Sequence, residues 1–166
     1  GLATSFNAGI SLGSGSYFQV VNGAMVVYGA GGTAVGSGAG AHGVSLYGGS
    51  LLSTGSGNIT ITGTKIAGIG AAFYIGSTGN VVGGASATGN ITMNVNQLSW
   101  NVVNVQTTGV ITVAPTTAAW TMGLGTGAGN LALTAAYLNI LNGGSYVFGS
   151  ITTGDLTINT VKDFSS

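Results

Sequence analysis

The chain has 166 residues, of which 33 are glycine, two are lysine, two are acidic and none is cysteine or arginine, with a formal net charge of zero. About a quarter of an ordinary soluble protein is charged, so this composition excludes a basic nucleic-acid-binding face and a polybasic membrane surface. Hydrophobic residues make up 45% of the chain, which is too many for a disordered polymer, and no apolar run is long enough to predict a transmembrane segment.

The first 42 residues carry the weakest pattern. "AGISL" at 8–12 and "HGVSL" at 42–46 only echo the later repeats, and residues 29–41 are so rich in glycine that we expect a loop there. We expect one domain over 1–166. Within it, residues 1–42 are expected to be less regular and to form an N-terminal cap or assembly segment, followed by a repeat region at 43–160 and a tail at 161–166.

A short motif recurs from residue 56 onward. "SGNITI" at 56–61 returns as "TGNITM" at 88–93, "TGVITV" at 108–113, "AGNLAL" at 128–133 and "TGDLTI" at 153–158. In each copy an aliphatic residue alternates with threonine or alanine, and such alternation between glycines predicts short strands. The glycines of successive copies are 32, 20, 20 and 25 residues apart. A period near 20 is too short for a βαβ unit and suits one turn of a β-solenoid.

We therefore predict an all-β chain, a parallel β-solenoid with turns of about 20 residues, roughly eight turns in all, stacked ~4.8 Å apart. Trp100 and Trp120 are 20 residues apart, which indicates stacked positions on neighbouring turns unless the spacing is a coincidence. Charges are avoided because identical charges on stacked turns would repel. The residues expected in the structural ladders of the interior are Ile59, Ile61, Ile91, Met93, Trp100, Ile111, Val113, Trp120, Leu131, Leu133, Leu156 and Ile158. The expected outward row is Thr60, Thr92, Thr112 and Thr157.

Two segments depart from the strand pattern. Pro115 is expected at a corner that leaves the strand 110–113. In 131–145, the residues Ala135, Ala136, Leu138 and Leu141 are expected to form about one helical turn after a strand. The aromatic residues are expected to fill the core or an interface, with an exposed row for binding sugar as the alternative.

Residues that could carry catalysis or bind a metal are scarce. His42 is the only histidine, and we expect it to have a structural or surface role because distant residues of a solenoid lie on distant turns. Asp155 occupies the turn position that asparagine holds in three other copies, and Asp163 lies in the tail, so a carboxylate pair is not expected. The sequence predicts neither catalytic residues nor a metal or cofactor site, and we expect no enzyme activity.

Three segments resemble the repeats of filamentous-haemagglutinin-like bacterial surface proteins: "GVSLYGGSLLSTGSGNITITGT" at 43–64, "ITVAPTTAAWTMGLGTGAGNLALTAAYLNIL" at 111–141 and "GSITTGDLTI" at 149–158. The resemblance covers roughly residues 43–160. It implies a right-handed parallel β-helix, a secreted or bacterial cell-surface location, and a role in adhesion or in building a surface fibre. Such proteins are usually much longer, and no secretion domain or membrane anchor is visible in this sequence.

These observations lead to a hypothesis of a non-enzymatic structural or adhesive protein, a β-solenoid segment of a secreted adhesin or of a self-assembling extracellular filament. The expected partner is a second copy of the chain, because solenoid ends are unpaired strand edges that charge does not protect. Host or surface glycans are a second class of partner, and nucleic acid is not expected. The alternatives are an ice-binding solenoid, whose surface would carry flat rows of threonine, and a strand-exchanged, pilin-like fibre subunit.

Overall fold

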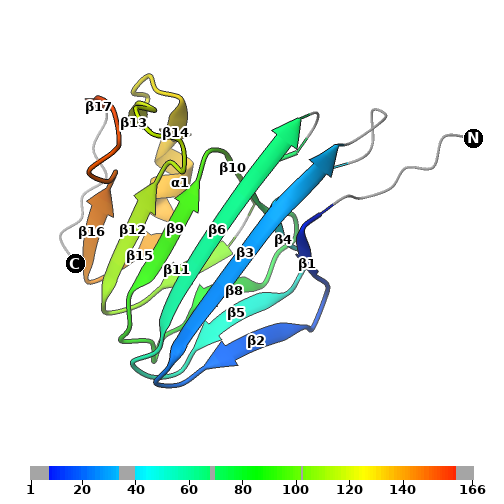
Figure 1. Cartoon of the computed structure of the whole chain (residues 1–166). Helices are drawn as coiled ribbons and strands as arrows, with labels where there is room; N and C mark the ends of the chain where they lie inside the picture. Colours follow the sequence, from blue (N-terminus) through cyan, green and yellow to red (C-terminus); the bar gives the residue numbers. More distant parts are fainter. Residues whose placement is uncertain (1–7, 34–39, 68–69, 102, 160–166) are drawn as a thin grey trace, which may run out of the picture.

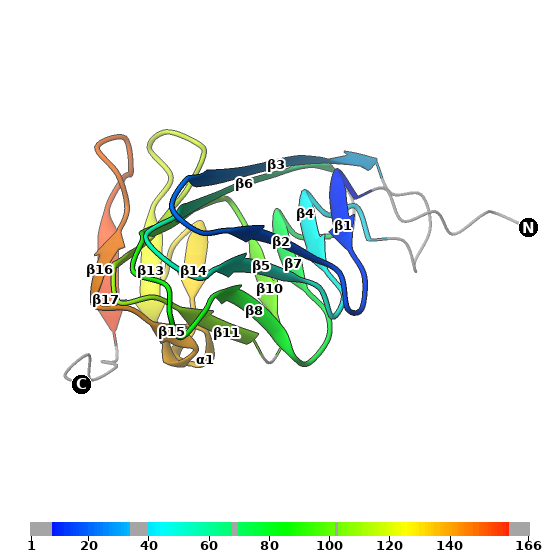
Figure 2. The same cartoon turned by 90° about the horizontal axis from the view of Figure 1, so that it is seen from below.

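The strands of the chain wind into a solenoid of four turns and the start of a fifth (Figures 1 and 2). A computed structural model describes residues 8–33, 40–67, 70–101 and 103–159. Almost all of its regular structure is β, as the alternating motif predicts. The fold is therefore the predicted all-β solenoid with parallel sheets.

Each complete turn contributes three strands. The first turn holds β1 (Ile10–Leu12), β2 (Tyr17–Val20) and β3 (Ala24–Thr33). The second holds β4 (Val44–Leu46), β5 (Ser50–Ser53) and β6 (Asn58–Ala67). The third holds β7 (Phe73–Ile75), β8 (Asn80–Gly83) and β9 (Ile91–Val95). The fourth holds β10 (Leu98–Trp100), β11 (Val103–Gln106) and β12 (Val110–Ala114), and β15 (Leu141–Asn142) with β16 (Ser145–Phe148) begins the fifth.

Equivalent strands of successive turns pair in parallel and form three sheets. Sheet A is β1-β4-β7-β10, sheet B is β2-β5-β8-β11-β15, and sheet C is β3-β6-β9-β12-β16. Inward side chains stand in columns along the axis: Ile59, Ile91 and Ile111 are in register in sheet C, and all three are buried. A single turn cannot bury its own apolar face, so stacking the columns is what creates the core.

Turn length is less uniform than the sequence suggests. Only the step from Ile91 to Ile111 is 20 residues, because Ile59 pairs with Ile91 and Ile111 pairs with Tyr146, which are 32 and 35 residues apart. Three strands and three corners generally need more residues than the shortest repeat spacing provides. The chain therefore completes four turns, and the expectation of roughly eight was wrong.

The last two copies of the motif leave the solenoid. They form β14 (Leu131–Leu133) and β17 (Leu156–Asn159), which flank β13 (Met122–Gly125) in a separate sheet D. Both strands pair with β13 through Met122, so a repeated motif here encodes strand pairing without fixing which sheet receives the strand. Figure 1 shows sheet D beyond the β16 side of sheet C.

Several expected ladder positions are consequently wrong. Leu156 and Ile158 are exposed on β17 rather than inward-facing, and Thr157 pairs with Gly123 of sheet D, not with the threonines of sheet C. Trp100 pairs with Ile75 in sheet A, whereas Trp120 lies between β12 and β13, so the two tryptophans are not stacked. Leu131 and Leu133 are buried, but in sheet D.

The segment after β14 is the expected helical turn. Helix α1 (Ala135–Asn139) begins at Thr134, whose side chain accepts a hydrogen bond from the Tyr137 backbone N–H. The Tyr137 ring packs against Trp100 with ring centroids 5.5 Å apart, and its hydroxyl accepts the Trp100 N–H. Helix α1 thus covers the β10 end of sheet A. Pro115 directly follows β12, as expected for a corner.

The N-terminal segment is more regular than predicted. Residues 29–33 belong to strand β3 rather than to a loop, and β3 pairs with β6 from Ala24 to Thr33; residues 34–39 lie outside the described part of the chain. A Cβ at Gly29 would overlap the Gly43 carbonyl oxygen of the next turn, so glycine is needed there for close approach of the backbones. Residues 8–33 are thus a full turn of the solenoid.

Candidate functional site

The glycine and asparagine of the repeated motif build the corner that precedes sheet C. The Asn58 side-chain oxygen accepts the Asn90 N–H at 2.7 Å, and the Asn90 side-chain oxygen accepts the Val110 N–H at 3.0 Å. In sheet D, Asn130 accepts the Thr121 N–H in the same manner. These bonds satisfy backbone donors at the corners. The motif is therefore a stacking device, which explains its recurrence.

The outer face of sheet C carries the threonines expected there. Thr60, Thr92 and Thr112 are in register on β6, β9 and β12, but the same column ends in Val26 on β3 and Val147 on β16. The neighbouring outward column contains Tyr28, Thr62 and Asn94. One column of three threonines is not a flat threonine array, so the geometry does not favour ice binding.

The first turn forms the N-terminal end face of the solenoid, which comprises β1, β2 and β3. Among the described residues, each of these strands has one partner strand, so its outer edge is not paired. Phe18 continues an inward column in which Leu51 is fully buried, yet Phe18 is 48% exposed because no turn covers it. Outward residues are still more exposed. The large exposed side chains of this turn are Tyr17, Phe18, Val21, Val26 and Tyr28.

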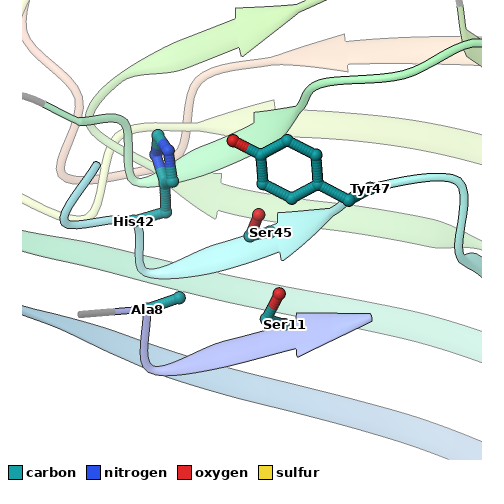
Figure 3. A pocket seen from close by; sticks show the side chains of 5 residues that line it. All are labelled: Ala8, Ser11, His42, Ser45 and Tyr47. Atoms are coloured by element: carbon teal, nitrogen blue, oxygen red, sulfur yellow. The ribbon is translucent and has the colours of Figure 1, made fainter. Parts of the chain in front are cut away.

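A small cleft lies on the outer side of sheet A. It has a volume of about 280 Å³ and is lined by Ala8, Ser11, His42, Ser45 and Tyr47 (Figure 3). Ser11 on β1 and Ser45 on β4 are in register, with Tyr74 of β7 next in the same outward column. His42 precedes β4 and Tyr47 follows it, so both ends of one three-residue strand contribute a ring.

The His42 ring is held from two sides. Its Nδ1 accepts the Ala71 backbone N–H at 3.0 Å, and its face stacks on Tyr74 with ring centroids 4.0 Å apart and an interplanar angle of 16°. Burial lowers the pKa of His42, and the positive charge of Lys65 acts in the same direction. A neutral imidazole that accepts at Nδ1 carries its proton on Nε2, so Nε2 can donate a hydrogen bond and cannot take a proton from Ser45.

The hydroxyl groups of the cleft differ in their surroundings. Ser45 is 1% exposed, and its Oγ has no hydrogen-bond partner. Ser11 is exposed at the edge of the cleft. The Tyr47 ring lies 5.1 Å from Tyr74, and burial together with a hydrogen bond to Tyr74 raises the pKa of Tyr47 to about 12. The cleft therefore combines neutral hydroxyl, imidazole and aromatic groups.

Clusters that could hold a metal ion were sought among His, Cys, Asp and Glu. The described residues contain no group of three or more that could do so. Asp155 lies in the turn before β17, and Asp163 falls outside the described residues, so the structure brings no carboxylate pair together. In the described ranges, no helix is long and apolar enough to cross a bilayer.

The cleft was not predicted from the sequence, although "HGVSLY" at 42–47 contains the signal. A short strand with an inward Val44 and Leu46 directs Ser45 outward, and the flanking His42 and Tyr47 can then close around it. Recognising this required the position of Tyr74 on the next turn. Comparison of the chain with family models, curated proteins and solved structures gave no match.

Proposed function

We propose that the chain is a structural subunit of an extracellular filament, in which solenoids stack end to end through the N-terminal end face. The observation that supports this most directly is the first turn itself: three parallel strands with unpaired outer edges and exposed apolar side chains. Residues 8–33 contain no charged side chain. Proteins that must avoid edge pairing usually protect such strands with charges, prolines or a covering element.

The strand β3 is the longest of these edges. Asn58 donates its N–H to the Gly23 carbonyl, which sets the alternation of the parallel pair. By that alternation, the peptide groups of Met25 and Val27 face β6, and those of Val26 face the outer edge. Val26 is also 72% exposed. A further parallel strand would pair with these groups and cover the valine.

The opposite end of sheet C offers a matching surface. Val147 on β16 stands in the column that begins with Val26, and it is 47% exposed. Stacking β16 of one copy on β3 of the next continues this column through the junction. Repetition of that contact gives an open filament rather than a closed dimer, because the two surfaces differ. The resemblance to bacterial surface repeats supports a secreted or cell-surface location and an adhesive role for such a filament.

The test is assembly of the purified chain, imaged by negative-stain electron microscopy and followed by fibre diffraction. The proposal predicts unbranched filaments with a meridional repeat near ~4.8 Å. Val26→Pro removes an outward-facing N–H at an edge position that tolerates proline, so it should block assembly and keep the fold. Val26→Thr, which installs the residue of the interior turns, should still assemble.

Three results would contradict the proposal. Monodisperse monomers of the unmodified chain at high concentration would exclude stacking altogether. Closed dimers would retain the N-terminal end face as an interface but exclude the filament. Equal assembly of Val26→Pro and the unmodified chain would exclude β3 as the contact, provided that circular dichroism shows the same fold for both.

A further inference from the structure

The cleft on sheet A has the features of a ligand site that is independent of stacking. It faces sideways from the solenoid, whereas stacking uses the end faces (Figures 2 and 3). We propose that this cleft binds one ring of a neutral sugar, with Ser45 and His42 as hydrogen-bond partners and Tyr47 as an aromatic contact. The proposal goes beyond filament formation and does not depend on it.

Ser45 gives the first argument. A hydroxyl that is 1% exposed and has no partner is uncommon, because buried polar groups in native structures are almost always hydrogen-bonded. Figure 3 shows this hydroxyl on the same side of the sheet as the His42 ring. A serine hydroxyl can both donate and accept, which is the capacity of a sugar hydroxyl as well. Water does not reach this oxygen, so only a group that enters the cleft fully can bond to it.

His42 gives the second argument. Its Nδ1 is occupied by the Ala71 N–H and its ring is fixed against Tyr74, so the orientation of Nε2–H is set before any ligand arrives. Within the described chain, no hydrogen bond to Nε2 is formed. A fixed N–H donor beside an unpartnered hydroxyl matches two adjacent oxygen atoms on one ring.

Charge and size restrict the class of ligand further. Among the described residues, the lining of the cleft contains no charged side chain, so a charged ligand would lose hydration without gaining a counter-charge. A volume of about 280 Å³ lies at the small end of ligand pockets and suits one ring rather than an oligosaccharide. A pyranose has a C–H face that can pack on Tyr47 and hydroxyls at its rim. These properties together favour a neutral hexose, free or at the end of a glycan.

Nuclear magnetic resonance offers a direct test because His42 is the only histidine in the chain. The imidazole signals of the full chain are followed during titration with the methyl glycosides of glucose, galactose and mannose. Glucuronate and glucosamine serve as charged counterparts. We expect at least one neutral glycoside to shift the His42 Nε2 signal saturably, and the charged sugars to cause no saturable shift.

A matched pair of variants makes the test specific. Ser45→Ala removes the unpartnered hydroxyl, and Ser99→Ala removes a serine from the same outward column on β10. We expect Ser45→Ala to weaken glycoside binding about fivefold to tenfold, and Ser99→Ala to leave it unchanged. Ser45→Ala should also raise Tm of the ligand-free chain, since it removes a buried polar group that has no partner.

Either of two results would overturn the proposal. One is the absence of a saturable His42 shift with all three neutral glycosides. The other is equal binding by Ser45→Ala and the unmodified chain, which would show adventitious association elsewhere. Repeating the titration on the assembly-blocked Val26→Pro variant separates the two proposals, because sugar binding is expected there even though stacking is not.

Discussion

The side-chain oxygen of Asn58 accepts the backbone N–H of Asn90, the residue at the equivalent corner one turn later, at 2.7 Å. Asn90 repeats the contact with Val110. The bond therefore joins turns to one another and is not a feature of either turn alone. A sequence repeat becomes a structural repeat through this contact.

Removal of one such bond should lower stability measurably. Asn58→Ala leaves the Asn90 N–H without its acceptor, and we expect the free energy of unfolding to fall by about 1 kcal/mol. Asn104→Ala is the control, because the Asn104 side chain bonds only the exposed Gln106 side chain. The control should change stability by less than about 0.5 kcal/mol. Urea unfolding of both variants measures the difference, and equal values would show that the corner bond contributes nothing.

Glycine at the same corner is needed for close stacking. A Cβ at Gly89 would overlap the Gly57 carbonyl oxygen of the preceding turn, whereas a Cβ at Gly13 would meet no atom. We expect Gly89→Ala to destabilise the chain by roughly 1–3 kcal/mol, which corresponds to a fall in Tm of about 2–4 °C per kcal/mol. Gly13→Ala should leave Tm nearly unchanged. Comparable losses in the two variants would contradict this account of the corner.

Stability should decline in mild acid because of His42. Burial lowers its pKa in the folded state, so the unfolded chain binds the proton more readily once the pH falls below 6.5. The contribution of the neutral imidazole is thus fully present above that pH and is lost as the pH drops toward the folded-state pKa. Tyr74, Tyr47 and Lys65 are the nearby titratable groups, and none of them changes charge in this window at its ordinary pKa.

Thermal melts between neutral and mildly acidic pH would measure this effect. His42→Gln is the matched variant, because an amide does not titrate. Since the chain contains no other histidine, the slope of Tm against pH should disappear in the variant over this range. A slope that persists unchanged would assign the acid sensitivity to a group other than His42.

Filament assembly should depend little on salt. The first turn contains no charged residue, so there is no ionic attraction or repulsion at the junction for salt to screen. We expect similar assembly rates by light scattering between about 0.01 M and 0.1 M ionic strength. A rate that changes by an order of magnitude over this range would indicate that charged groups outside the end face control association.

Filament growth should also be stopped by small amounts of a blocked subunit. Val26→Pro alters only the first-turn edge and leaves the β16 edge of the same molecule unchanged. Such a subunit can add to a filament at one end and then offers no surface for the next copy. We expect substoichiometric Val26→Pro to shorten filaments of the unmodified chain, as seen by electron microscopy. Inhibition only at equimolar amounts would contradict head-to-tail growth.

Local patterns predicted the strands well because each depends on a few adjacent residues. Alternation placed Ile59, Ile61 and their equivalents on β6, β9 and β12, and the small helix after β14 followed from Ala135 and its neighbours. The destination of a strand was not predictable in this way. "AGNLAL" and "TGDLTI" match the solenoid motif, yet they pair with Met122 in sheet D. Strand pairing over long separations depends on packing that no single segment contains.

The cleft illustrates the same limit from the side of function. His42 was expected to be structural or superficial because its neighbours in sequence carry no catalytic partner. Its actual environment is supplied by Ala71 and Tyr74, about thirty residues later and one turn on. In a solenoid, side chains from successive turns form a site together. Candidate sites in such chains are therefore found by comparing residues at equal register.

The placement of one motif in two sheets also affects how the chain folds. While the chain is unfolded, the edge of β9 can accept "AGNLAL" as readily as "TGVITV", since both supply a glycine corner and two aliphatic residues. Only later contacts, such as Tyr137 against Trp100, distinguish the native pairing. Refolding should therefore pass through misregistered species and be slow for a chain of this length, as is usual where distant strands must pair.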